Sequence, residues 1–381
     1  MKQKQPRDLL SAERKRAGLS YDGILSSVFA IVLGLIVGLI ILFLCNPAQA
    51  LPGFATILTG AFTHGAKGIG QVFYYATPII LTGLSVGFAF KTGLFNIGTP
   101  GQFIMGGFGA VYVGILWTSL GPAHWLVALL ASVVTGAVWG LVPGLLKAYY
   151  NVNEVIASIM MNYIGMYLVN WTVKSSKPLF NNLRNESRNV AATANIPKMG
   201  LDKIFPGSSV NGGIIIAIIV VILIYLLLNK TTFGYELKAV GFNRDASKYA
   251  GINEKKSIIM SMMIAGAIAG LAGGLLYLAG TGKHIEIKDV LASEGFTGIS
   301  VALLGLSNPI GVLFSGIFIA YLTAGGFYLQ LFEFSTEIID IIVAVIIYFS
   351  AFALMVKMLI GKVQKARHEK EEAQTKGGGD A

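Results

Sequence analysis

The sequence KTGLFNIGTPGQ, residues 91–102, separates two long apolar runs with residues that do not suit a continuous helix. Its three glycines and one proline weaken the helix, while Asn96 and Gln102 offer hydrogen-bonding groups. If the two runs lie in a membrane, the break frees backbone groups for which lipid supplies no partner. We therefore expect these groups to be satisfied inside the protein or by water, in a re-entrant or discontinuous helical element.

The composition of the whole chain is that of a membrane protein. Of its 381 residues, 54% are hydrophobic and 13% are charged, whereas soluble domains carry about 25% charged residues. Several apolar runs reach about 20 residues, which is enough to cross a bilayer as helix. The sequence predicts an all-α, polytopic membrane protein of about ten transmembrane helices, near 24–45, 69–90, 94–117, 123–146, 154–173, 213–229, 258–280, 290–306, 309–329 and 338–360.

Basic residues mark both chain ends and one long loop, which sets the expected orientation. Cytoplasmic loops carry an excess of Lys and Arg, and an even number of spans places both termini on the side of the 230–257 loop. The loop 174–212 is also basic but falls outside, since long loops translocate largely regardless of charge. We predict a basic cytoplasmic N-terminus (1–23), one transmembrane domain (24–360) and a disordered basic cytoplasmic tail (361–381).

The glycines and the net charge are both explained by a membrane setting. The net charge of +10 arises at chain ends and in loops, a pattern that favours contact with anionic lipid over nucleic acid. Glycines four residues apart let helix backbones approach closely. Such pairs are Gly34/Gly38, Gly83/Gly87, Gly136/Gly140, Gly140/Gly144 and Gly266/Gly270.

The sequence offers no chemistry for an enzyme. It contains no GxxxxGK[ST], HExxH, CxxC or GxSxG motif, its one cysteine excludes a disulfide within the chain, and its four histidines are expected in loops or the tail. We predict no catalytic residue and no metal site. The carboxylates Glu154, Glu294, Glu333, Glu337 and Asp340 lie near ends of predicted helices, which disfavours an ion-coupled carrier without excluding one.

The 230–257 loop, KTTFGYELKAVGFNRDASKYAGINEKK, predicts a short helix with exposed small residues. An asparagine provides the N-cap, the helix runs from about residue 244 to 250, and a glycine ends it. Two alanines four residues apart would suit insertion into a groove on a partner, with charged residues at the rim. An ordinary amphipathic loop is the alternative. The predicted docking residues are Asn243, Arg244, Asp245, Ala246, Lys248, Ala250 and Gly251.

Four blocks resemble the permease subunits of ABC importers in the ribose, branched-chain amino acid and nucleoside branch. They are GLSVGFAFKTGLFNIGTPGQ (83–102), TTFGYELKAVGFNRDASKYAGIN (231–253), GFTGISVALLGLSNPIGVLFSGI (295–317) and AYLTAGG (320–326). The resemblance covers about residues 69–356 and is closest to nucleoside importers that work with a basic-membrane-protein-type lipoprotein. No Glu-Ala-Ala triplet precedes the glycine of the 230–257 loop, so the pattern departs from maltose-type permeases.

This resemblance implies an alternating-access nucleoside importer in a bacterial plasma membrane. A second permease, often a different chain, cytoplasmic ATP-binding subunits and an extracellular substrate-binding lipoprotein would be its partners. ATP and Mg would be bound by the partner ATPase, with no cofactor in this chain. The 244–252 helix would couple the permease to that ATPase. A sugar or amino acid permease, or an ion-coupled transporter, stays an alternative.

A polar solute crossing such a protein needs hydrogen-bonding groups along its path. These groups gather in the opening stretch, on the 154–173 helix and at a second break, LGLSNPIG (304–311). Phe90, Phe95 and Phe296 could stack on a flat base. Hydrogen bonding between neighbouring helices is the alternative role for the polar residues. The predicted path residues are Phe90, Asn96, Thr99, Gln102, Ser158, Asn162, Ser300 and Asn308.

Overall fold

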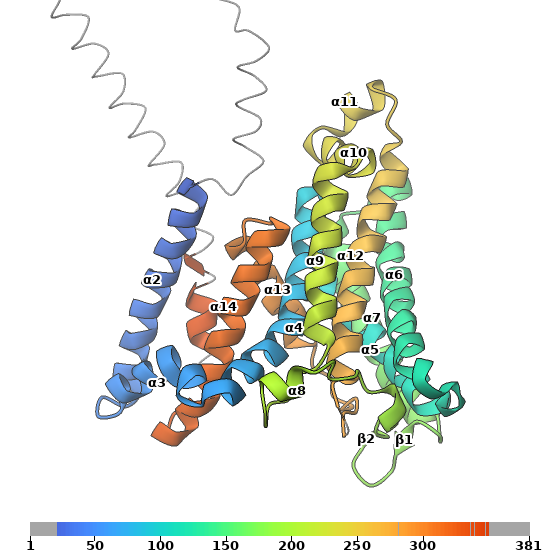
Figure 1. Cartoon of the computed structure of the whole chain (residues 1–381). Helices are drawn as coiled ribbons and strands as arrows, with labels where there is room; N and C mark the ends of the chain where they lie inside the picture. The colour runs from blue at the N-terminus through green and yellow to red at the C-terminus, as the bar shows by residue number, and fades with distance from the viewer. Residues whose placement is uncertain (1–20, 281, 336, 339, 347, 350–381) are drawn as a thin grey trace, which may run out of the picture.

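A computed structural model of the chain describes residues 21–280, 282–335, 337–338, 340–346 and 348–349, and the described chain forms a helical bundle (Figure 1). The all-α prediction is confirmed, with one two-stranded hairpin as the exception. Most of the predicted N-terminal segment, the tail and the end of the tenth predicted span lie outside the described residues.

The elements follow one another along the chain with short connections in most places. The helices are α2 (Tyr21–Cys45), α3 (Ala50–Thr63), α4 (Gly65–Lys91), α5 (Thr99–Leu116), η1 (Thr118–Ala123), α6 (His124–Tyr150), α7 (Glu154–Ser175), η2 (Ala192–Ala194), α8 (Leu201–Ile204), α9 (Gly213–Lys230), α10 (Thr232–Phe242), α11 (Arg244–Tyr249), α12 (Glu254–Tyr277), α13 (Ser293–Leu304), α14 (Pro309–Phe327) and η3 (Tyr328–Phe332). The strands β1 (Phe180–Asn181) and β2 (Glu186–Ser187) pair antiparallel.

Several of these helices are suited to a bilayer. Within the described residues, 5 helical segments are long and apolar enough to cross a membrane: Gly65–Lys91, Thr118–Tyr150, Gly213–Lys230, Glu254–Tyr277 and Pro309–Phe332. The protein is thus a multi-pass membrane protein, as predicted.

The predicted interruptions are present at two helices. The third predicted span begins at Thr99 instead of residue 94, because residues 92–98 are not helical. The eighth, α13, has 12 residues, about 18 Å of helix against a hydrocarbon core of about 30 Å. It therefore cannot cross the bilayer alone, and the prediction of a full span at 290–306 is wrong.

Three further features depart from the sequence-based expectations. Helix α3 is too short for a span and went unpredicted; it forms because Gly53, Ile57 and Gly60 pack onto η3 and α14. Helix α10 precedes α11 within the 230–257 loop, starting at Thr231, whose hydroxyl accepts a hydrogen bond from the Gly234 N–H. His124, expected in a loop, is the buried first residue of α6.

Glycines bring the backbones of α6 and α12 into direct contact. A Cβ atom on Gly136 or Gly140 would overlap the carbonyl oxygens of Gly266 and Met262, respectively, and one on Gly266 would overlap the carbonyl oxygen of Gly136. Gly270 of the same stripe packs on α6 in the same way. The packing role predicted for these glycine pairs is confirmed, and it leaves no space for a larger side chain.

Replacing Gly140 with leucine will destabilise the bundle, because the added side chain must separate α6 from α12. Overpacking of this kind costs about 1–3 kcal/mol or more, so the thermal unfolding midpoint in detergent should fall clearly. The matched control is Ala137→Leu on the partly exposed face of the same helix. Equal midpoints for the two variants would contradict the close α6–α12 contact.

Candidate functional site

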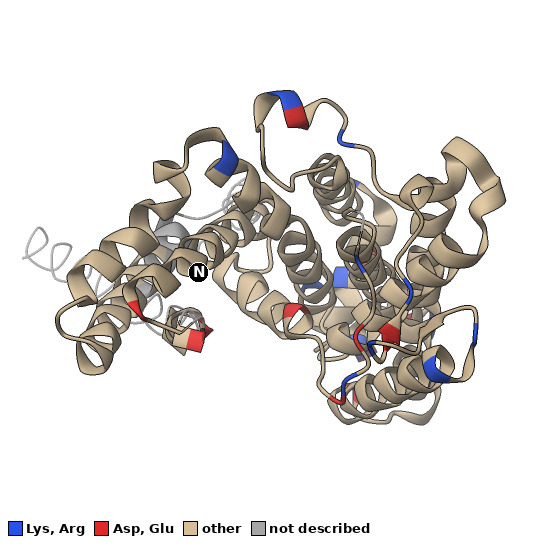
Figure 2. Ribbon diagram, turned by 90° about the horizontal axis from the view of Figure 1, so that it is seen from below, with Lys and Arg blue, Asp and Glu red and all other residues tan. Residues whose placement is uncertain are grey.

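The two basic loops singled out in the sequence, 230–257 and 174–212, lie at opposite ends of the bundle. Helices α10 and α11 stand at one end, whereas the β1–β2 hairpin of the 174–212 loop lies at the other (Figure 1). Viewed from the hairpin end, the charged residues lie mainly in loops and at helix ends (Figure 2).

The break at residues 92–98 is held inside the protein by an asparagine of α7. The Asn162 side-chain N–H donates to the carbonyl oxygen of Ile97 over 3.0 Å, and its Oδ1 accepts from the Gly101 N–H over 2.8 Å. The Asn96 and Gln102 amides bond to each other over 2.9 and 3.2 Å. Of the backbone groups expected to find partners within the protein, these bonds satisfy the Ile97 carbonyl and the Gly101 N–H.

The two interrupted helices begin beside each other. A Cβ atom on Gly295 of α13 would lie 2.5 Å from Cα of Pro100 at the start of α5. The second predicted break follows α13 as a tight turn, in which Leu306 and Ser307 have positive φ angles of 53° and 52°. Asn308 closes this turn, because its side chain accepts a hydrogen bond from the Ile310 N–H and caps α14.

The predicted path residues fall into a buried group and an aromatic group. Asn96, Thr99, Gln102, Ser158 and Asn162 are each at most 1% exposed, and Ser300 is 6% exposed. The side chains of Asn96, Thr99, Gln102 and Asn162 bond to other groups of the protein, whereas the Ser158 hydroxyl is buried with no hydrogen-bond partner within the described residues. Their contact with a solute stays a prediction.

The aromatic residues lie closer to the surface. The Phe90 and Phe95 rings stack with their centroids 4.9 Å apart. Phe95 and Phe296 are 38% and 42% exposed, so both rings are accessible in the monomer.

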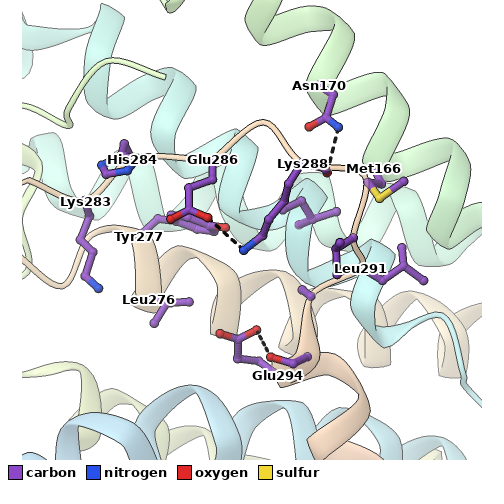
Figure 3. Close-up of a pocket in the computed structure, with 14 residues that line it drawn as sticks. Met166, Asn170, Leu276, Tyr277, Lys283, His284, Glu286, Lys288, Leu291 and Glu294 are labelled. Carbon is purple, nitrogen blue, oxygen red and sulfur yellow. Dashed lines mark hydrogen bonds and ion pairs between the residues drawn. The ribbon is translucent and has the colours of Figure 1, made fainter. Parts of the chain in front are cut away.

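A cavity of about 270 Å³ lies between α5, α7, α12 and the 278–292 segment that leads into α13 (Figure 3). This volume lies near the lower end of the range for small-molecule sites, about 300–1,000 Å³. None of the eight predicted path residues lines it. Its lining consists of Ile104, Met166, Asn170, Leu276, Tyr277, Lys283, His284, Glu286, Lys288, Val290, Leu291, Ala292, Ser293 and Glu294.

The segment over this cavity is held by the outer loop and by α7. The Ser187 backbone N–H donates a hydrogen bond to the Ile285 carbonyl oxygen, and the Ser187 hydroxyl oxygen accepts one from the Ile285 N–H, each over 2.9 Å. Glu186 pairs with His284 over 3.0 Å. The Asn170 amide donates to the Lys288 carbonyl oxygen over 3.1 Å. The 174–212 loop therefore holds the segment that lines the cavity, although none of its own residues lines it.

Charges of both signs surround the cavity mouth. The Lys288 ammonium lies 3.0 Å from the Glu286 carboxylate and holds the pKa of that carboxyl below its usual range. The Lys283 ammonium lies over the Tyr74 ring, 5.6 Å from its centroid. The half-buried Glu294 carboxylate accepts a hydrogen bond from the Ser293 hydroxyl over 3.4 Å. The charged run KHIEIKD at 283–289 was the signal in the sequence that could have indicated this region.

At the other end, α11 has the cap that the sequence predicts. Asn243 Oδ1 accepts a hydrogen bond from the Ala246 N–H over 2.9 Å. The helix ends at Tyr249, one residue earlier than predicted, and Gly251 follows with a φ of 81°. The Arg244 guanidinium donates to both carboxylate oxygens of Glu254, over 2.6 and 3.3 Å, and so ties α11 to the first turn of α12.

The outward face of α11 is small and apolar, as expected, and two aromatic residues extend it. Ala246 and Ala250 are exposed. Phe242 and Tyr249, which the sequence analysis overlooked, are 91% and 94% exposed. Exposed aromatic side chains beside small residues are typical of surfaces that contact another protein. The docking role of this face stays a prediction.

Residues 68–351 match the family described as branched-chain amino acid transport system / permease component. The chain belongs to this family. It is a permease, a transport subunit and not an enzyme. No solved structure gives a significant match.

Three relatives illustrate the range of the family. The guanosine ABC transporter permease protein NupP of Bacillus subtilis is 36% identical over 90% of this permease and 97% of its own length. The nucleoside ABC transporter permease protein NupB of Lactococcus lactis is 34% identical, over 93% and 97%. The glucose ABC transporter permease protein TsgB13 of Haloferax volcanii is 30% identical, over 78% of each chain.

Replacing Asn162 with leucine will destabilise the permease, because the Ile97 carbonyl and the Gly101 N–H lose their partner in a buried place. Each unsatisfied group costs about 1–3 kcal/mol, so the unfolding midpoint in detergent should fall and uptake should be lost. Ser158→Ala, one turn away on the same face, removes a hydroxyl that has no partner and should leave the midpoint unchanged or raised. A larger loss for Ser158→Ala than for Asn162→Leu would contradict this assignment.

Proposed function

We propose that this permease forms half of the membrane channel of an ATP-driven importer for nucleosides. The observation that carries the proposal is the similarity to NupP and NupB, which extends over at least 90% of the permease. TsgB13, named for glucose, aligns with a smaller share, 78%. The family as a whole therefore does not fix the substrate, and nucleosides are proposed from NupP and NupB, which are 36% and 34% identical over at least 90% of the permease.

In this proposal, energy enters through α11. Partner cytoplasmic ATP-binding subunits hold ATP and Mg, and the exposed Ala246, Ala250 and Tyr249 of α11 seat in a groove on them. The Arg244–Glu254 bond passes the motion of α11 to α12. Helix α12 has 24 residues, about 36 Å, and it ends at Tyr277 in the cavity wall. Movement of α12 then alters the access of the solute to the cavity.

The proposal also gives the permease an orientation. The α11 end and both chain termini lie in the cytoplasm of a bacterium, and the hairpin and cavity face outward. A substrate-binding lipoprotein delivers the solute at the outer face. A second permease chain completes the channel.

Replacing Ala246 with arginine will uncouple transport, because a long charged side chain cannot seat in a groove shaped for alanine. A mismatch that costs about 1.4 kcal/mol of docking energy already lowers affinity about tenfold. In proteoliposomes that contain the complete complex, ATPase stimulation and uptake should both fall by at least about that factor. The control is Leu183→Arg, a 94% exposed position at the opposite end. Full ATPase stimulation in the complex that carries Ala246→Arg would contradict the docking role.

The substrate proposal is checked by competition. Uptake of labelled guanosine by the complete complex should be suppressed by an excess of unlabelled adenosine or uridine, since the proposal assigns nucleosides as a class. Glucose and leucine at the same excess should have no effect. If glucose or leucine suppressed uptake and the nucleosides did not, the substrate would be a sugar or an amino acid and the nucleoside proposal would be wrong.

A further inference from the structure

The cavity combines a carboxylate with an apolar wall. Glu294 is half-buried, stands in the first turn of α13 and lines the same cavity as Tyr277. The two cavity lysines are engaged elsewhere, Lys288 with Glu286 and Lys283 over the Tyr74 ring. Glu294, by contrast, forms no ion pair within the described residues, so the lining holds one carboxylate that no lysine neutralises by direct pairing.

The apolar wall depends on a glycine of α5. A Cβ atom on Gly107 would come within 2.5 Å of the Tyr277 ring, so only the missing side chain lets this ring lie against α5. Ile104, Leu276 and Met166 continue the wall around the cavity. A flat apolar face opposite a hydrogen-bond acceptor suits a ligand with one aromatic part and several N–H or O–H donors.

We propose that this cavity binds the nucleoside during transit in its uncharged form, and that Glu294 makes the permease select against phosphorylated nucleosides. The base lies along the wall formed with the Tyr277 ring, and ribose hydroxyls or base N–H groups donate to the Glu294 carboxylate. A phosphate would bring like charge to a half-buried carboxylate, which is unfavourable in a site of reduced dielectric. This inference rests on the proposed function and adds a selection step within the membrane subunit.

The alternative is a purely structural role, in which Glu294 only complements the dipole of α13, as carboxylates in the first turn of a helix do. That role needs no contact with solute. The two roles differ in what happens to a thiol placed in the cavity wall when solutes are added.

The experiment uses the complete complex without its binding lipoprotein, in a Cys45→Ser background that removes the native thiol. Ala292→Cys places a thiol in the cavity wall, and its rate of reaction with a thiosulfonate reagent is measured. Guanosine should slow this reaction, whereas guanosine 5′-monophosphate at the same concentration should not. Adding Glu294→Gln should weaken protection by guanosine about tenfold, or about 1.4 kcal/mol, and allow protection by the monophosphate. Asp202→Asn, an exposed carboxylate on the same side, is the control and should change neither.

The outcomes separate this inference from the proposed function. If guanosine fails to protect the thiol, or if Glu294→Gln leaves both protections unchanged, the inference is overturned. The proposed function still stands in that case, provided that the complex with its lipoprotein takes up guanosine when ATP is supplied. Absence of nucleoside uptake by that complex would instead overturn the proposed function. A second variant, Gly107→Ala, displaces the Tyr277 ring and should reduce protection by guanosine; unchanged protection would remove the ring from the site.

Discussion

The need to satisfy backbone groups away from water governs the arrangement of this permease. A helix that stops inside a bilayer exposes N–H and C=O groups that lipid cannot bind. Asn162 resolves this problem for the break at 92–98, because one amide bonds both Ile97 and Gly101. With the break fixed, α5 begins beside α13 and packs against α12, and these three helices line the cavity together with α7 and the 278–292 segment.

The close contacts of α12 limit how this helix can move relative to its neighbours. Glycines on α5, α6 and α12 bring the three backbones together, so that α12 has little freedom to slide past its neighbours. One end of α12 is tied to α11 through Arg244 and Glu254, and its other end carries Tyr277. In the proposed mechanism, therefore, α12 moves together with α5 and α6, and the cavity changes shape where this group meets the 278–292 segment.

Features determined by nearby residues were predictable from the sequence. The Asn243 cap, the termination near Gly251 and the glycine stripes depend on residues within a turn or on a spacing of four. Features built from distant segments were not. Helix α3 forms through packing onto α14, and the cavity combines α5, α7, α12 and the start of α13. The anchoring of the break by Asn162 was equally inaccessible, because this residue lies 61 positions beyond its partner Gly101 in the chain.

The source of energy is the central claim, and one measurement addresses it most directly. Guanosine accumulation should be followed in proteoliposomes that hold the permease with its partner subunits, supplied either with ATP or with a proton or sodium gradient alone. The account predicts accumulation against a gradient with ATP, and none with the ion gradients or with the permease alone. Accumulation driven by an ion gradient through the purified permease, with no ATP-binding subunit present, would contradict it.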